Sequence, residues 1–273
     1  MKFPTLVLFL FSISMFSQEF SGIAYYKSKE NIKGTFKIAG VSEQKQKEIE
    51  EKMSKDFEKN AVLYFDKSTS VFSNIKELQV SNSKNNGVNV SSSSDDEGKI
   101  FKNIKEKTVS REEDLFDKPF IIEDKLELLD WKISDETKKI GDYNCQKAVA
   151  IIPVSQKDLD DYKKELEQVK AFNITMEVKA PKPKVHTVWF TPFIPVNNGP
   201  AQYWGLPGLI LEASDGRISY FCTKIVLNPI KKVIIAKPIK GKKVTQKQFD
   251  KISDEKTESM KGKDGIIHLN IGG

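Results

Sequence analysis

The side chains that most often perform catalysis are few in this sequence. The chain of 273 residues has two histidines, His186 and His268, and two cysteines, Cys145 and Cys222. Hydrolytic catalysis needs a nucleophile beside a base, with a third group that orients the base. Neither histidine lies in a catalytic motif, and two histidines cannot build a multi-histidine metal centre. We therefore expect no enzymatic activity, no cofactor and no bound metal.

Acidic side chains are abundant, but their pattern does not define a site. The sequence has 38 of them, so pairs such as those in 112–114 and 123–124 are expected at solvated turns. The run Asp95-Asp96-Glu97 lacks the ligand spacing of a calcium loop of the EF-hand kind. Choosing an acid and a base among these carboxylates would be arbitrary.

Four aromatic residues are the candidate binding residues: Trp189, Phe193, Tyr203 and Trp204. Trp and Tyr combine a large apolar area with one polar atom, which makes them effective anchors when they are partly exposed. Prolines interrupt the backbone around them, and loops present side chains outside a regular ladder. Core packing is the alternative role, and it is favoured for Trp189 because its neighbours are strand-like.

The segment after these aromatics predicts a sharp turn followed by a hairpin. In Leu206-Pro207-Gly208-Leu209 the Pro and Gly occupy the second and third positions of a type II turn, which requires a positive φ at Gly208. Strand 209–214, the turn Asp215-Gly216 and strand 217–227 then form a hairpin. This register places two sets of residues on one apolar face, so that the hairpin belongs to the core: Leu209, Leu211 and Ala213 with Ile218, Tyr220 and Cys222. It also places Glu212 diagonal to Arg217 on the other face.

The two cysteines lie in candidate strands close to this turn. A disulfide requires Cα atoms within about 7 Å of each other, which the sequence cannot establish. Cys145 and Cys222 are therefore either a disulfide or two separate buried thiols, and both alternatives stay open.

The elements that position these residues are mostly short strands. Alternating or apolar runs predict strands at 20–29, 61–65, 70–75, 100–109, 118–123, 128–134, 143–152, 175–178 and 185–190. Amphipathic spacing predicts two helical insertions, at about 41–60 and 155–172, the second with a start box formed by Ser155 and Asp158. We expect a mainly β (α+β) fold, built as one strongly curved antiparallel sheet or open half-barrel with inserted amphipathic helices.

The N-terminus has the pattern of a signal peptide. Lys2 precedes the apolar run 6–11, and small residues follow up to Ser17. We expect residues 1–17 to be removed and residues 18–273 to form a single domain, located in the periplasm or at the outer membrane. The segment 81–99, rich in Ser, Asn, Asp and Gly, is expected to be a flexible loop.

The positive charge is concentrated near the C-terminus and consists of lysine. Twelve lysines and four acidic residues lie between Lys224 and Lys263, whereas the whole chain has only two arginines. Lysine lacks the bidentate fork with which arginine binds phosphate, so nucleic-acid binding is disfavoured. A solvated surface is the favoured interpretation of this segment, and contact with an anionic membrane is the alternative.

The run Gly205-Leu206-Pro207-Gly208-Leu209-Ile210 resembles the signature of the GLPGLI family of exported bacterial proteins. Residues 143–148, 189–195, 199–200 and 238–249 are similar to other conserved elements of that family. Phe193 departs from it, because many relatives have an acidic residue there, and helix 155–172 resembles an insertion. The resemblance implies an exported, mainly β protein, and the family has no established activity to transfer.

Three classes of function are consistent with these observations. The favoured one is a non-catalytic binding or accessory protein of the cell envelope that contacts another envelope protein. The alternative is a carrier of an apolar, lipid-like ligand, and a hydrolytic enzyme is third. An enclosed apolar cavity would favour the carrier, an exposed aromatic patch the accessory protein, and converging polar groups in a cleft the enzyme.

Overall fold

The computed structural model describes residues 20–31, 41–75, 98–171, 178–231 and 233–260. These residues form a mainly β protein, as the sequence predicts. Segment 1–17, nearly all of loop 81–99, most of strand 175–178 and His268 lie outside the described residues. None of the helices within the described ranges is long and apolar enough to cross a membrane.

The described strands form one sheet of twelve, in the order β12-β6-β5-β4-β3-β2-β1-β11-β10-β9-β8-β7. Their bounds are β1 Ser21–Glu30, β2 Lys59–Asp66, β3 Thr69–Ile75, β4 Ile100–Asn103, β5 Thr108–Leu115, β6 Lys118–Lys125, β7 Lys132–Ile140, β8 Tyr143–Ile152, β9 Lys184–Thr191, β10 Leu209–Ser214, β11 Ile218–Leu227 and β12 Lys242–Val244. Neighbouring strands are antiparallel except β12 and β6, which are parallel. The pairing of β1 with β11 joins the two halves of the chain at the middle of the sheet.

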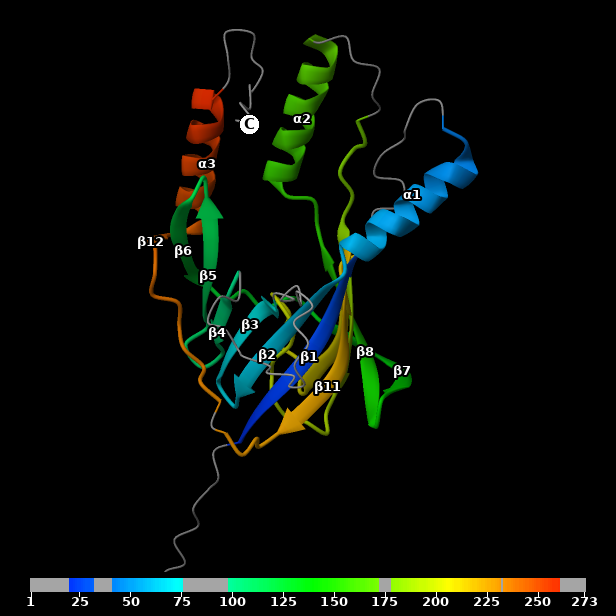
Figure 1. The fold of residues 1–273 in the computed structure, drawn as a ribbon, viewed down its shortest axis with the longest axis vertical. Helices are drawn as coiled ribbons and strands as arrows, with labels where there is room; N and C mark the ends of the chain where they lie inside the picture. The colour runs from blue at the N-terminus through cyan, green and yellow to red at the C-terminus, as the bar shows by residue number, and fades with distance from the viewer. Residues whose placement is uncertain (1–19, 32–40, 76–97, 172–177, 232, 261–273) are drawn as a thin grey trace, which may run out of the picture.

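The described helices lie together at one end of the molecule, above the strands in Figure 1. They are α1 (Glu43–Asp56), α2 (Gln156–Ala171) and α3 (Gln246–Met260). Both predicted helical insertions are therefore confirmed, and so is the start box of α2. The Ser155 amide donates to the Asp158 carboxylate at 3.0 Å, and the Asp158 amide donates to the Ser155 hydroxyl at 3.1 Å.

Several predicted boundaries and one register are wrong. The expected strand 100–109 is divided into β4 and β5 by a turn, and β7 begins at Lys132 rather than at residue 128. In the hairpin, Ser214 pairs with Ser219 and Glu212 with Phe221, so the loop is longer than two residues. Glu212 forms an ion pair with Lys138 of β7 instead of approaching Arg217.

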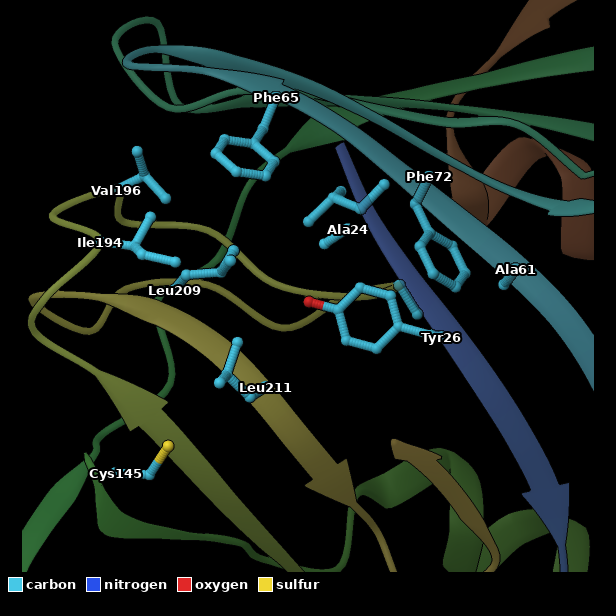
Figure 2. Close-up of a cluster of buried hydrophobic side chains, with 12 residues drawn as sticks. Ala24, Tyr26, Ala61, Phe65, Phe72, Cys145, Ile194, Val196, Leu209 and Leu211 are labelled. Atoms are coloured by element: carbon cyan, nitrogen blue, oxygen red, sulfur yellow. The ribbon is translucent and has the colours of Figure 1, made fainter. Parts of the chain in front are cut away.

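The main core lies between the strands of the first half and the chain that leads into β10. Figure 2 shows Ala24, Tyr26, Phe65 and Phe72 from β1 to β3 on one side of this cluster. Side chains from the second half face them: Ile194, Val196, Leu209, Leu211 and Cys145. The Tyr26 hydroxyl donates to the Ile210 carbonyl at 2.7 Å, so its polar atom is satisfied inside the core.

Candidate functional site

The segment 192–208, which we call the motif loop, connects β9 to β10 and contains most of the GLPGLI run. Short-range backbone hydrogen bonds stiffen it, such as that from the Val196 amide to the Ile194 carbonyl at 2.8 Å. It also pairs with the start of β10, because the Leu209 amide donates to Ile194 and the Ile210 amide donates to Asn198, each at 3.0 Å. The motif loop is therefore a defined structure despite its prolines.

Lys102 of β4 connects the motif loop to the strands β1 to β6 by hydrogen bonds. Its side chain is fully buried, and its Nζ donates to the Gly199 carbonyl at 2.6 Å and to the Tyr203 carbonyl at 2.9 Å. Beside it on β3, the Ser70 hydroxyl donates to the Asn198 side-chain oxygen at 3.0 Å. Burial lowers the pKa of Lys102 to about 7. Sequence reasoning missed this residue, since no pattern separates it from the other lysines.

Tyr203 and His186 form a second buried polar contact. The Tyr203 hydroxyl lies 3.2 Å from His186 Nδ1, and both side chains are at most 5% exposed. Burial raises the pKa of Tyr203 and lowers the pKa of His186, so both groups are neutral near pH 7. This contact satisfies two buried polar groups and does not present an acid or base to solvent.

Two tryptophans fix the motif loop to the chain that precedes β7. The Trp204 indole donates to the Glu127 carbonyl at 2.8 Å, and the Trp131 indole donates to the Trp204 carbonyl at 2.9 Å. Gly205 follows with a φ of +97°, and a Cβ there would collide with the Leu128 side chain. The φ favours glycine at this position, and the Leu128 side chain would have to rotate to admit a Cβ.

An open hollow of about 410 Å³ lies where these two segments meet. It is lined by Leu128, Leu129, Asp130, Trp131 and Gly205. Leu128 is 62% exposed, whereas Trp131 is half-buried and held by its hydrogen bond to the motif loop. Sequence reasoning did not single out residues 128–131 as a site, because the contact between Trp131 and Trp204 spans 73 positions.

The expected type II turn at Gly208 is wrong. The positive φ belongs to Gly205, and the Gly208 amide instead donates to the Leu206 carbonyl at 2.8 Å, closing a three-residue turn around Pro207. Gly208 is needed for another reason. A Cβ at Gly208 would overlap the Thr191 carbonyl oxygen and lie 2.9 Å from the Pro192 nitrogen, so two backbone segments pass too closely for a side chain.

The four candidate aromatic residues divide into buried and exposed ones. Tyr203 and Trp204 are 0% and 4% exposed, so they pack in the core and do not present a part-exposed contact surface. Trp189 is half-buried, with the Lys138 ammonium 4.3 Å from the centre of its ring. Phe193 is 72% exposed and remains available for contact. In the GLPGLI run, residues 205–210, the side chains of Leu206, Leu209 and Ile210 are buried.

Cys145 and Cys222 are free thiols in the structure. Burial raises the pKa of Cys145 to about 11 and that of Cys222 to about 12. A thiol with a raised pKa carries little reactive thiolate at neutral pH, so both behave as small apolar residues. Across the described ranges, no group of three or more His, Cys, Asp or Glu side chains is placed to hold a metal ion.

The fold and the motif loop define a mainly β protein with one open sheet and a buried, hydrogen-bonded loop. Residues 131–212, which run from the hollow through the motif loop into β10, match a family described as "Protein of unknown function (Porph_ging)". No curated protein matches the chain.

Two solved structures are similar to the chain: "Structure of PNGF-II in C2 space group" and "Structure of PNGF-II in P21 space group". Each has a TM-score of 0.47 and 16% sequence identity over 87% of this chain. The chain spans about one third of their length, 33% and 34% respectively.

Proposed function

We propose that this chain is an exported cell-envelope protein of the GLPGLI family with a non-catalytic binding or accessory role. The signal-like segment 1–17 supports export, and the run 205–210 supports the family. The match of residues 131–212 to an uncharacterised family covers that run. The sheet in this proposal is curved as an open half-barrel, with the motif loop against its inner face.

The observation that carries the proposal is that the motif loop packs into the main core of the described sheet. Ile194 and Val196 pack against β1 to β3 (Figure 2), and Lys102 holds the loop by two hydrogen bonds. Displacing the loop would leave the buried amine and the carbonyls of Gly199 and Tyr203 unpaired, which is costly. An accessory protein that binds a partner at its surface fits this filled interior better than a lipid-like carrier does.

The partner surface in this proposal is the hollow at residues 128–131. Leu128 offers an exposed apolar side chain, and Trp131 is an aromatic anchor whose orientation is fixed by Trp204. A few anchor residues, above all Trp, Tyr and Arg in well-packed pockets, contribute most of the binding energy in protein interfaces. Asp130 adds a carboxylate to the lining. The expected partner is an envelope protein that inserts an apolar side chain next to a basic one.

Co-purification from native envelopes, followed by mass spectrometry of proteins and lipids, tests the proposal. Leu128→Glu should lose a protein partner that the wild type retains. The matched control is Ile151→Glu, at a residue that is 61% exposed on β8 and outside the hollow. Equal recovery with both variants would reject the hollow as the contact surface, and stoichiometric lipid bound to the wild type would favour the carrier instead.

A further inference from the structure

Beyond this partner surface, one segment of the chain exposes apolar and basic side chains together. Residues 228–241 connect β11 to β12, and residues 233–241 of this segment run along one side of the molecule, as the orange trace at the left of Figure 1 shows. Three isoleucines in it are nearly or fully exposed: Ile230 at 106%, Ile234 at 82% and Ile239 at 88%. Single exposed apolar residues are common on proteins, but three within ten positions give this segment an unusual share of exposed apolar side chains.

The charge around these isoleucines is positive. Residues 228–243 include six lysines and no acidic residue. The exposed lysines Lys231 and Lys240 each directly follow an exposed isoleucine. A soluble polyanion would attract the lysines without requiring isoleucines, whereas a bilayer with anionic headgroups accommodates both.

The described part of this segment is also attached to the body of the protein. Pro238 is buried, and Val233 and Ile235 are half-buried, on either side of the exposed Ile234. Lys237 forms an ion pair with Glu123 of β6 at 2.9 Å. Because the segment is held at these points, its exposed isoleucines lose little additional backbone freedom when they enter a bilayer.

We propose that the described residues of the segment 230–240 form a membrane-contact segment that binds the surface of an anionic phospholipid bilayer, with Ile230, Ile234 and Ile239 entering the interface and Lys231 and Lys240 facing the headgroups. The segment does not span the bilayer. This contact uses different residues from the hollow at residues 128–131, so each proposal can fail without the other.

Co-sedimentation of the full chain with lipid vesicles tests this proposal. The wild type should bind vesicles of phosphatidylcholine containing about one third phosphatidylglycerol, and bind pure phosphatidylcholine vesicles much more weakly. A triple variant carries Ile230→Ser, Ile234→Ser and Ile239→Ser. Its affinity for the anionic vesicles should be lower than that of the wild type by about tenfold or more. Its melting temperature should not change, since the three side chains are exposed.

The matched control replaces two apolar residues on the sheet, Ile151→Ser and Val185→Ser, which are 61% and 48% exposed. This control should bind vesicles as the wild type does. A second measurement places a reporter in the segment: Ile234→Trp should be quenched by brominated lipid in anionic vesicles more strongly than Ile151→Trp. Segment 1–17 is common to all variants, so it does not contribute to these differences.

Three outcomes would overturn the proposal. Equal vesicle binding by the triple variant and the wild type would show that the isoleucines do not enter the bilayer. Equal binding of the wild type to neutral and anionic vesicles would remove the role of the lysines. A loss of self-association in the triple variant, with no vesicle binding by the wild type, would assign these isoleucines to contact between copies of this chain.

Discussion

Lys102 is the residue whose ionisation should most clearly affect stability. Burial lowers its folded-state pKa to about 7, while an unfolded lysine keeps its usual pKa near 10.5. Below pH 7 both states hold the proton, and above it the folded state releases the proton while the unfolded state keeps it. The unfolded state then binds more protons, so the free energy of unfolding rises as the pH increases above 7.

We therefore expect the free energy of unfolding to rise by roughly 1 kcal/mol per pH unit between about pH 7.5 and 8.5. Above about pH 9 the trend should reverse, because the pKa values of Cys145 and Cys222 are raised by burial and their unfolded forms ionise first. Urea titrations at several pH values measure the free energy of unfolding as a function of pH. Lys102→Met should abolish the rise, and a rise that persists in this variant would contradict the assignment.

Glycine substitutions separate backbone strain from close approach. Gly208→Ala should be the most destabilising, by about 3 kcal/mol or more, because its Cβ would meet the backbone at Thr191 and Pro192, which cannot move aside as a side chain can. Gly205→Ala should cost about 1–2 kcal/mol, from its positive φ and a Leu128 side chain that can rotate. Melting temperatures of the purified variants give the order.

Gly216→Ala is the control for backbone strain alone, because Gly216 has a φ of +86° and a Cβ there would meet nothing within 4 Å. If Gly208→Ala destabilises the protein no more than Gly216→Ala does, the backbone at Thr191 leaves room for a Cβ at position 208. The sequence singled out Gly205 and Gly208, but it could not show why each must be glycine. The close approach of Gly208 to Thr191 depends on where β9 ends.

At the scale of elements, α2 offers a direct test of local stability. In its start box the Asp158 amide donates to the Ser155 hydroxyl, and the Asp158 carboxylate accepts from the Ser155 hydroxyl and amide. The hydrogen bonds from the Ser155 hydroxyl and amide lower the pKa of Asp158 to about 2. Ser155→Ala should destabilise the helix by about 1 kcal/mol. Amide exchange within 156–171 should accelerate about fivefold, with little change in β8 or β9.

Lys164→Ala in the same helix is the control, because this exposed residue lies away from the cap and alanine favours helix. It should not accelerate exchange. Uniform acceleration across the sheet in Ser155→Ala would show that α2 unfolds only with the whole domain.

The elements that sequence patterns predicted correctly are those whose signals are local. Both helical insertions follow from apolar spacing, and strands such as β1, β8 and β9 follow from alternation. The start of β7 was missed because residues 126–131 are positioned by distant contacts. Leu126 is buried, and the indole of Trp131 bonds to the Trp204 carbonyl. Taken alone, the apolar residues of 128–134 have the pattern of a strand.

At the scale of the whole molecule, the pairing of distant strands was beyond sequence reasoning. Nothing in the local pattern of β1 indicates that it pairs with β11, about 200 positions later. The candidate site depends on the same kind of contact, since Lys102 reaches carbonyls 97 and 101 positions away. The mainly β class and the importance of the motif run were therefore predictable, whereas the buried state of Tyr203 and Trp204 was not.

These long-range contacts predict that the two halves of the sheet unfold together. Phe72 of β3 is 4% exposed, and its ring lies 5.7 Å from that of Tyr220 on β11, with the planes at 84°. Phe72→Ala should lower the free energy of unfolding by about 3–5 kcal/mol, because it leaves a cavity between the halves. The tryptophans, at 131, 189 and 204, all lie in or beside the half of the sheet formed by β7 to β11.

Denaturant unfolding followed by both tryptophan fluorescence and far-ultraviolet circular dichroism tests this coupling. In Phe72→Ala the two midpoints should shift together and remain coincident, because loss of packing in the first half also weakens the second. Phe57→Ala, at a residue that is 40% exposed, is the control and should shift neither midpoint appreciably. If the fluorescence midpoint stays at its wild-type value while the dichroism midpoint falls, the halves fold independently, and the contacts of Lys102 and Phe72 do not unite the sheet.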